Sequence, residues 1–429
     1  MRAYRQHRGA AYLVALLAGS IVTVAGLASL SLTTSRARTT AMADHAARAR
    51  ALANSGLDHA RSAVAAHVDG GGTRADIFGA ANPSMPLDGG DFGWSLRRMD
   101  GTAIGNTDEP IVVRAWGRHG QARYGLRATF PPSGVPYDVL DTCMYVGGTL
   151  SIGLLANLTG DKVIGAATEI NVGLTATGTA PLESPGQVTG AGALTYGGAT
   201  SSNAPERRLP DASLLNYYIA LGERISLASL PYSGSVYMLE DVLLSPASNP
   251  FGNTNELGIY IIDLQGSERL QIRNTRSVGT LVLINTESNN VIIGSNTLMQ
   301  PAFEWMPSLL VRGGVTFMGT ASGPDESVLG INLNPPSTPY DLQSDEDLDD
   351  AYPGRIQGVS YITGDTTFAL PRQHIRGTMI IGGNATVRTS VAINVSYDPS
   401  VATLPPFGFF DDQGGLAIDP ASITWTLPD

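Results

Sequence analysis

The sequence predicts an α+β, mainly β protein: an N-terminal transmembrane α-helix with a small antiparallel sheet, followed by a domain that resembles a parallel β-helix, or solenoid. Three observations favour this class. Positions 10–32 carry no charge, Gly (50) and Pro (26) are abundant while only 15% of residues are charged, and Asn-Thr pairs recur at a fixed interval. A balance of many turn residues and few charges is typical of short strands joined by tight turns. We expect five segments: a cytoplasmic basic leader (1–9), a transmembrane helix (10–32), an amphipathic extension (33–70), an antiparallel β head (75–131) and a solenoid-like domain (135–429).

The apolar stretch AAYLVALLAGSIVTVAGLASLSL is long enough to span a membrane. At about 1.5 Å per residue, its 23 residues cover a hydrocarbon core of about 30 Å. Arg2, Arg5 and Arg8 precede it, and a basic flank favours a cytoplasmic tail. We therefore expect a single-pass protein of the bacterial cytoplasmic membrane with its N-terminus inside and its body in the periplasm or on the cell surface. The alternative is a cleavable secretory signal that is cut at Ala41-Met42-Ala43.

Apolar residues continue beyond the span at spacings of three or four as far as Val68, with charged residues between them. This periodicity predicts an Ala-rich amphipathic helix, which the triple glycine at 70–72 ends. A helix of this length suits lateral packing against other helices.

The N-terminal region resembles that of PilX-like minor pilins and of GspK-type pseudopilins of type II secretion. The residues that carry the resemblance are Arg8-Gly9-Ala10, the run YLVALL at 12–17 and the segment ALANSGLDHARSAV at 51–64. The resemblance covers about the first 65 residues. It implies that a prepilin peptidase cuts after Gly9 and that Ala10 becomes the new N-terminus. Major pilins carry a glutamate where this sequence has Val14, so the minor branch is the one implied.

The resemblance also implies a non-enzymatic, membrane-anchored component of a type IV pilus or a type II secretion-like assembly. Its partners would be other pilin-like subunits, which pack in the membrane against the apolar side of the N-terminal helix. We expect this contact at Leu13, Leu16, Leu17, Ile21 and Leu27. Such a protein would act in adhesion or secretion by presenting its β-rich body.

Three runs of strand-forming residues follow the helix: GWSLRRM (93–99), IVVRAWG (111–117) and ARYGLRATF (122–130). Turn signals at Asp100-Gly101 and at 118–120 separate them, so we expect a small antiparallel meander. A Pro-Pro-Ser-Gly segment at 131–134 then predicts a linker to the second domain.

The second domain contains an internal repeat. Asn274, Asn285 and Asn296, each followed by Thr, are 11 residues apart, and an aliphatic residue stands four positions before each of them. In a solenoid of about 22 residues per coil, equivalent positions stack, so that aliphatic side chains form the core and Asn side chains form amide ladders. The alternative is a β-sandwich. The domain also resembles an uncharacterised β-rich region joined to PilX-like N-termini in planctomycete-like bacteria, through LLSPASNPFG (243–252), GIYIID (258–263), GTLVLIN (279–285) and SYDPS (396–400).

Composition excludes several other functions. The net charge is −11 and the basic residues are scattered, with Lys162 as the single lysine, so no nucleic acid is expected as a partner. One cysteine, Cys143, excludes an internal disulfide framework. No histidine pair has the four-residue spacing of a helical zinc site.

Acidic residues leave two possibilities open. Solenoid domains can cleave polysaccharides with two or three convergent carboxylates, so a secreted polysaccharide-binding or polysaccharide-cleaving protein is the competing hypothesis. The acidic residues from 345 to 350 are crowded into one Pro-flanked segment, however, which indicates a solvated loop. We therefore predict no catalytic residue and no obligatory cofactor, and calcium as the one candidate ion. Its candidate ligands are Asp345, Asp347, Asp349 and Asp350.

Overall fold

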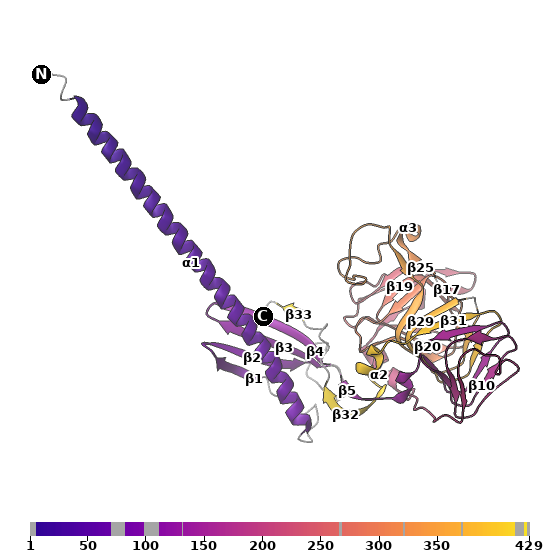
Figure 1. Ribbon diagram of the computed structural model, residues 1–429. Coiled ribbons are helices and arrows are strands. Elements are labelled where there is room, and N and C mark those ends of the chain that lie inside the picture. Colours follow the sequence, from indigo (N-terminus) through magenta and orange to yellow (C-terminus); the bar gives the residue numbers. More distant parts are fainter. Residues whose placement is uncertain are drawn as a thin grey trace. The chain divides into compact units, whose positions relative to one another are not determined.

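The computed structural model describes residues 6–69, 82–97, 111–130, 132–265, 268–320, 322–369, 372–416 and 424–426. These residues form two compact units. The first contains the long helix and an antiparallel sheet, and the second contains a large, mainly parallel sheet (Figure 1).

Helix α1 (Gln6–Asp69) is continuous for 64 residues. It runs without a break from the apolar stretch into the amphipathic segment, as the spacing of apolar residues predicted. By length and composition, this helix is suited to cross a membrane. Its C-terminal half buries one stripe of small and aliphatic side chains against the sheet: Ala49, Leu52, Ala53, Leu57, Ala60 and Val64.

The sheet of the first unit has the order β1 (Asn82–Leu87), β2 (Gly90–Arg97), β3 (Ile111–His119), β4 (Ala122–Phe130) and β33 (Thr424–Thr426), and each neighbouring pair is antiparallel. The meander of β2, β3 and β4 was predicted, whereas β1 was not. Asp88 and Gly89 join β1 to β2 with φ of 48° and 74°, the left-handed conformations of a tight hairpin turn. The predicted turn at Asp100-Gly101 lies outside the described residues.

Strand β33 departs from the expected organisation. We predicted that 135–429 belongs entirely to the second domain, yet Thr424, Trp425 and Thr426 pair with Arg127, Leu126 and Gly125 of β4. In the order of the chain, the second unit is therefore inserted between β4 and β33, which are two strands of the first sheet. Three residues with Thr at both ends carry too little pattern for the sequence to reveal this return.

The second unit begins with β5 (Pro132–Pro136) and the short helix η2 (Asp138–Asp141), and then winds into coils. The first coil is β6 (Met144–Val146), β7 (Thr149–Ile152) and β8 (Asn157–Gly160). The second is β9 (Ile164–Ala166), β10 (Glu169–Val172) and β11 (Thr177–Gly178), followed by β12 (Leu182–Ser184), β13 (Gln187–Thr189) and β14 (Thr200–Ser202). Met144 lies opposite Ile164 and Leu150 opposite Ile170 in parallel register, so aliphatic side chains stack from coil to coil in the core.

After helix α2 (Leu214–Leu221), a second series of coils begins. It comprises β15 (Glu223–Ile225), η3 (Leu227–Ser229), β16 (Tyr232–Ser233), β17 (Val236–Leu244), β18 (Ile259–Asp263), β19 (Leu270–Val278), β20 (Thr280–Thr286), β21 (Val291–Ile293), β22 (Thr297–Gln300), β23 (Pro307–Gly313), β24 (Val315–Phe317), β27 (Arg355–Ile362), β28 (Thr366–Phe368), β29 (Arg372–Ile381), β30 (Ala385–Val387) and β31 (Ala392–Ser396). A loop with β25 (Ser322–Asp325), α3 (Glu326–Leu329) and β26 (Ala351–Pro353) interrupts it. Helix α4 (Ser400–Thr403) and β32 (Phe410–Leu416) follow it.

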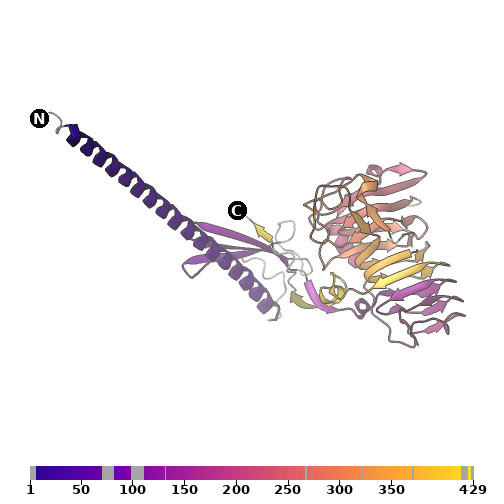
Figure 2. The same ribbon diagram turned by 45° about the horizontal axis from the view of Figure 1, so that its top comes forward.

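The two series meet in the middle of the stack. Strands β29, β30 and β31 pair in parallel with β6, β7 and β8, so the last coil adds to the open side of the first coil, and β5 pairs antiparallel with β32. Figure 2 shows the yellow final strands beside the purple first strands. The large parallel sheet is thus nearly closed into a barrel-like solenoid, and this parallel pairing excludes the β-sandwich alternative.

The predicted amide ladder is confirmed. Asn296 donates from Nδ2 to Oδ1 of Asn274 at 3.0 Å, and Asn274 donates to Asp241 at 2.9 Å. The intermediate residue, Asn285, bonds instead to Asp263 on another ladder at 2.7 Å. The 11-residue interval is therefore half a coil. All three Asn residues have φ between 49° and 58°, a left-handed conformation that Asn adopts more readily than most residues.

Candidate functional site

The N-terminal half of α1 is an exposed apolar surface. Every side chain from Ala15 to Asp44 is exposed. The five residues predicted for assembly expose 59–66% of their surface: Leu13, Leu16, Leu17, Ile21 and Leu27. At about 3.6 residues per turn these five lie on one side of the helix, while Val22, which is 72% exposed, lies on the opposite side. Apolar surface of this extent is stable only in an apolar surrounding, because each transferred Leu or Ile contributes about 1.5–3 kcal/mol.

Polar side chains within this half satisfy their hydrogen-bonding groups on the helix itself. The hydroxyl of Ser20 donates to the carbonyl of Leu17, and that of Thr23 donates to the carbonyl of Gly19, both at 2.8 Å. Thr33 bonds in the same way to Ser29 at 2.8 Å. Hydroxyls that bond to their own helix need no water, which lowers the cost of placing them in hydrocarbon.

The predicted processing residues, Gly9 and Ala10, lie on the helical backbone of α1. Their side chains are outside the described residues, so cleavage at this position stays a prediction.

The C-terminal half of α1 approaches the sheet very closely. A Cβ added to Gly117 of β3 would lie 2.3 Å from the carbonyl oxygen of Ala49 and 2.4 Å from the backbone nitrogen of Ala53. A Cβ on Gly56 of the helix would lie 3.0 Å from the carbonyl oxygen of Gly93. The helix therefore packs with its backbone almost against the strands, and small residues on both sides permit this contact.

Polar contacts fix the same half along its length. Nδ1 of His45 lies 2.7 Å from Nδ1 of His119, and the indole nitrogen of Trp94 donates to Nδ1 of His59 at 3.0 Å. On the sheet, the hydrogen bond from Ser84 and the Arg118 guanidinium, 2.8 Å away, lower the pKa of the Asp91 carboxyl. These links position the helix rather than form a reactive site.

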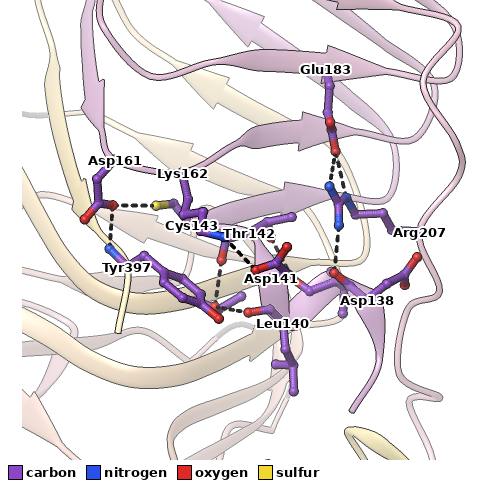
Figure 3. A network of polar contacts seen from close by, with 12 residues as sticks. Asp138, Leu140, Asp141, Thr142, Cys143, Asp161, Lys162, Glu183, Arg207 and Tyr397 are labelled. Carbon is purple, nitrogen blue, oxygen red and sulfur yellow. Dashed lines mark hydrogen bonds and ion pairs between the residues drawn. The ribbon is translucent and has the colours of Figure 1, made fainter. Parts of the chain in front are cut away.

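In the second unit, a polar network closes the solenoid where its two series of coils meet (Figure 3). Asp161 accepts a hydrogen bond from the backbone of Tyr397 at 2.7 Å and from the Cys143 thiol at 3.4 Å. Lys162 pairs with Asp141 at 2.8 Å and lies over the ring of Tyr397. Burial raises the pKa of the Cys143 thiol to about 12. The thiol therefore stays protonated at neutral pH and serves packing rather than chemistry.

The four candidate aspartates of the acidic run divide into two pairs of different character. Asp345 and Asp350 are half-buried and both contact the side chain of Asn334, whereas Asp347 and Asp349 are exposed. The pKa of Asp349 is raised, first by its contact with Asp347 and then by the neighbouring carboxylates. Within the described residues, no group of three or more His, Cys, Asp or Glu side chains is placed to hold a metal ion.

The second unit has a groove of about 430 Å³, which bears on the polysaccharide hypothesis. Its lining includes Arg224, Tyr237, Asp263 and Glu268. Asp263 is held by Arg224 at 3.2 Å and by the ladder residue Asn285, so its oxygens already have partners in the fold. A pair of free, facing carboxylates, which glycoside hydrolysis needs, is not found in this groove.

Comparisons with known proteins add little to this geometry. No family model matches the chain, and no curated protein matches it. Among solved structures, the chain is similar to the competence-associated pilin ComZ from Thermus thermophilus, with 12% identity, 90% of this chain and 98% of that chain covered, and a TM-score of 0.31. A TM-score of this size does not establish a common fold.

Proposed function

We propose that this protein is a membrane-anchored, non-enzymatic, pilin-like subunit that carries a solenoid-like domain as its exported body. One observation carries the proposal: α1 is a single continuous helix that is apolar on all sides as far as Leu32 and whose second half is packed on an antiparallel sheet. Such a helix joins a membrane span directly to a folded head. The sequence resemblance to PilX-like and GspK-type N-termini supports the same role.

The exposed half of α1 would serve first as the membrane anchor and then as the contact with neighbouring subunits. In lipid, helices associate through close packing and not through the hydrophobic effect. Gly19 and Gly26 fit this use, since a Cβ on either would meet nothing within 4 Å, which leaves room for another helix. By helical spacing, the side of α1 that carries Leu13, Leu16, Leu17, Ile21 and Leu27 is not the side of these glycines, and it would contact lipid or a second neighbouring helix.

Retention of the helix is favoured over its removal as a secretory signal. The alternative cleavage site, Ala41-Met42-Ala43, lies inside α1, 26 residues before its end at Asp69. A signal peptidase needs a site that directly follows a short apolar region, whereas Ala41-Met42-Ala43 lies beyond Arg36 and Arg38, well past the end of the apolar run. The prepilin-type site after Gly9 lies instead before the apolar span.

Mass spectrometry of the mature N-terminus, from membrane and sheared-surface fractions of the native host, tests the proposal. We expect a chain that begins at Ala10. Gly9→Val should block this processing, and Gly19→Val, a matched change with open space around it, should not. A mature chain that begins near Asp44 would overturn the proposal and favour the secreted polysaccharide-binding alternative.

A further inference from the structure

The solenoid has a flat outer face where its two series of coils meet. Strands β27, β29, β31 and β8 lie side by side in parallel register, beside the junction that Figure 2 shows. Alternate residues of these strands, such as Ile356, Ile375, Val395 and Leu158, are buried in the core. The residues between them therefore point outward.

Two rows of outward side chains cross these strands. The first row runs through Arg355, His374, Asn394 and Thr159. The second row lies two positions earlier on the strands and runs through Arg372, Ala392, Asn157 and, on β11, Thr177. With about 4.8 Å between neighbouring strands, each row is about 14 Å long. We call these eight residues the polar platform; seven are polar and none is a carboxylate.

Positive charge is concentrated at one end of the polar platform. Burial lowers the pKa of the His374 imidazole, and the charges of Arg372 and Arg355 lower it further, so both guanidinium groups lie close to this ring. Among the residues that the structure describes, none of these three side chains forms an ion pair with a carboxylate. Arg376 of the same strand differs, because it pairs with Asp398 at 3.2 Å. The end at Arg355, Arg372 and His374 is therefore suited to attract an anion.

The rest of the polar platform offers amide and hydroxyl groups. Asn394, Asn157 and Thr177 are exposed, and their side chains have no hydrogen-bond partner within the described part of the chain. Amides and hydroxyls can each donate and accept hydrogen bonds. They can therefore bind the hydroxyl groups of a ligand without a change in the fold.

A hollow borders the second row at the turn between β30 and β31. Its volume is about 460 Å³, and its lining includes Arg388, Thr389 and Ser151 but no carboxylate. Thr389 lies three residues before Ala392 of the second row. The hollow thus extends the same combination of arginine and hydroxyl groups around the edge of the platform.

We propose that the polar platform binds an acidic polysaccharide. Carboxylate groups of the polymer would lie at the end formed by Arg355, Arg372 and His374, and its sugar hydroxyls would bond to the Asn and Thr side chains of the two rows. Charge complementarity supports this ligand, since the platform has three basic side chains and no acidic one. The inference adds a ligand to the exported body and does not rest on the membrane anchor.

A nucleic acid fits the same surface less well. Duplex DNA carries one charge per about 1.7 Å of its axis and is bound through many phosphate contacts, whereas the cations here occupy one end of the platform. None of the eight side chains is aromatic, so no ring is present on which an unpaired base could stack. The net charge of −11 also disfavours a polymer of high charge density.

Calorimetric titration of polygalacturonate into the detergent-solubilised full chain, in EDTA, tests the proposal. We expect binding that weakens as NaCl is raised, and no binding of dextran, a neutral polysaccharide. Arg372→Gln removes a cation and Asn394→Asp adds a carboxylate, so each should weaken binding about tenfold, the size expected for a hydrogen bond to a charged group. Absence of polygalacturonate binding, or equal binding of dextran, would overturn the proposal.

A matched arginine distinguishes the platform from the total charge of the chain. Arg224→Gln changes the net charge as Arg372→Gln does, but Arg224 pairs with Asp263 on β15, which does not pair with any strand of the platform. It should change the affinity less than about twofold. Equal losses in the two variants would show that binding is not at the platform, and tighter binding of duplex DNA than of polygalacturonate would replace the proposed ligand. Unchanged thermal melting of Arg372→Gln and Asn394→Asp should show that lost binding is not lost folding.

Discussion

The two halves of α1 share a backbone but differ in what surrounds them. From Ala15 to Asp44 every side chain is exposed, and as far as Leu32 the large residues are apolar on all sides. From Ala49 to Val64, one stripe is buried against β2 and β3, while charged residues such as Arg48 and Arg50 remain exposed. A helix that is apolar all around requires an apolar solvent, whereas a helix with one apolar stripe requires one partner surface.

The difference shows which interactions each half can make. The second half packs against β2 and β3 of the same chain, and small residues allow the helix and the strands to lie close together. The first half has no partner among the described residues, so its stabilisation must come from lipid or from other helices. Substitutions in matched pairs, one in each half, separate these two roles.

The largest contrast is expected between Leu57→Ala and Leu27→Ala. Leu57 is 6% exposed and Leu27 is 63% exposed. Truncating a buried Leu should cost about 2–5 kcal/mol, whereas the exposed site should change head stability by less than about 0.5 kcal/mol. Hydrogen exchange of amides in β2 and β3 measures this unit separately. Equal loss of protection in both variants would show that the two halves are not distinct.

The reverse contrast concerns the membrane. Leu17→Arg places a charge in the span, at a cost of about 2.5–3.5 kcal/mol for insertion, and should shift most of the protein out of the membrane fraction or abolish assembly. Head protection in hydrogen exchange should be unchanged. The conservative variant Leu17→Ile should stay in the membrane. Full retention and normal incorporation of Leu17→Arg would contradict an anchor in this half.

Glycine substitutions test the closeness of packing. Gly117→Ala would force the new methyl group against the backbone of Ala49 and Ala53, with an expected loss of about 1–3 kcal/mol. Gly26→Ala has open space and should leave head stability unchanged. Unfolding in denaturant, followed by the fluorescence of Trp94 and Trp116, reports the difference. A neutral Gly117→Ala would show that the helix can move away from the sheet.

The smallest effect is expected for the charges beside the boundary. Arg48 pairs with Asp44 at 3.1 Å, but the two side chains remain 48% and 56% exposed. Arg48→Ala should therefore cost no more than about 0.5 kcal/mol and leave the membrane fraction intact. A loss above about 1 kcal/mol would mean that charge, and not packing, fixes the second half.

Local patterns in the sequence were sufficient for several elements of the structure. The apolar spacing predicted one helix past position 32, and three strand-like runs predicted β2, β3 and β4. The 11-residue Asn interval predicted stacked coils, because a ladder repeats the same side chain wherever the backbone repeats the same left-handed turn. The hydrogen bond between Asn274 and Asn296 confirms this reasoning.

Long-range pairing was not predictable in the same way. The order of coils depends on β29, β30 and β31 joining β6, β7 and β8 across more than 200 residues of chain, and short strands contain no signal for a partner so distant. The acidic run was visible in the sequence as five carboxylates, four of which were equivalent candidate ligands. Its division into an inner and an outer pair depends on Asn334, which nothing in the local pattern connects to Asp345 or Asp350.

The sequence by itself determined the apolar length of α1, its periodic second half and the coil repeat, since each is a property of neighbouring residues along the chain. Only the tertiary structure decided which side of α1 the sheet covers, where β33 returns and how the two series of coils close. Those features arise from contacts between residues far apart in sequence. The burial of the residues in these contacts determines how much each contact changes the stability of the fold.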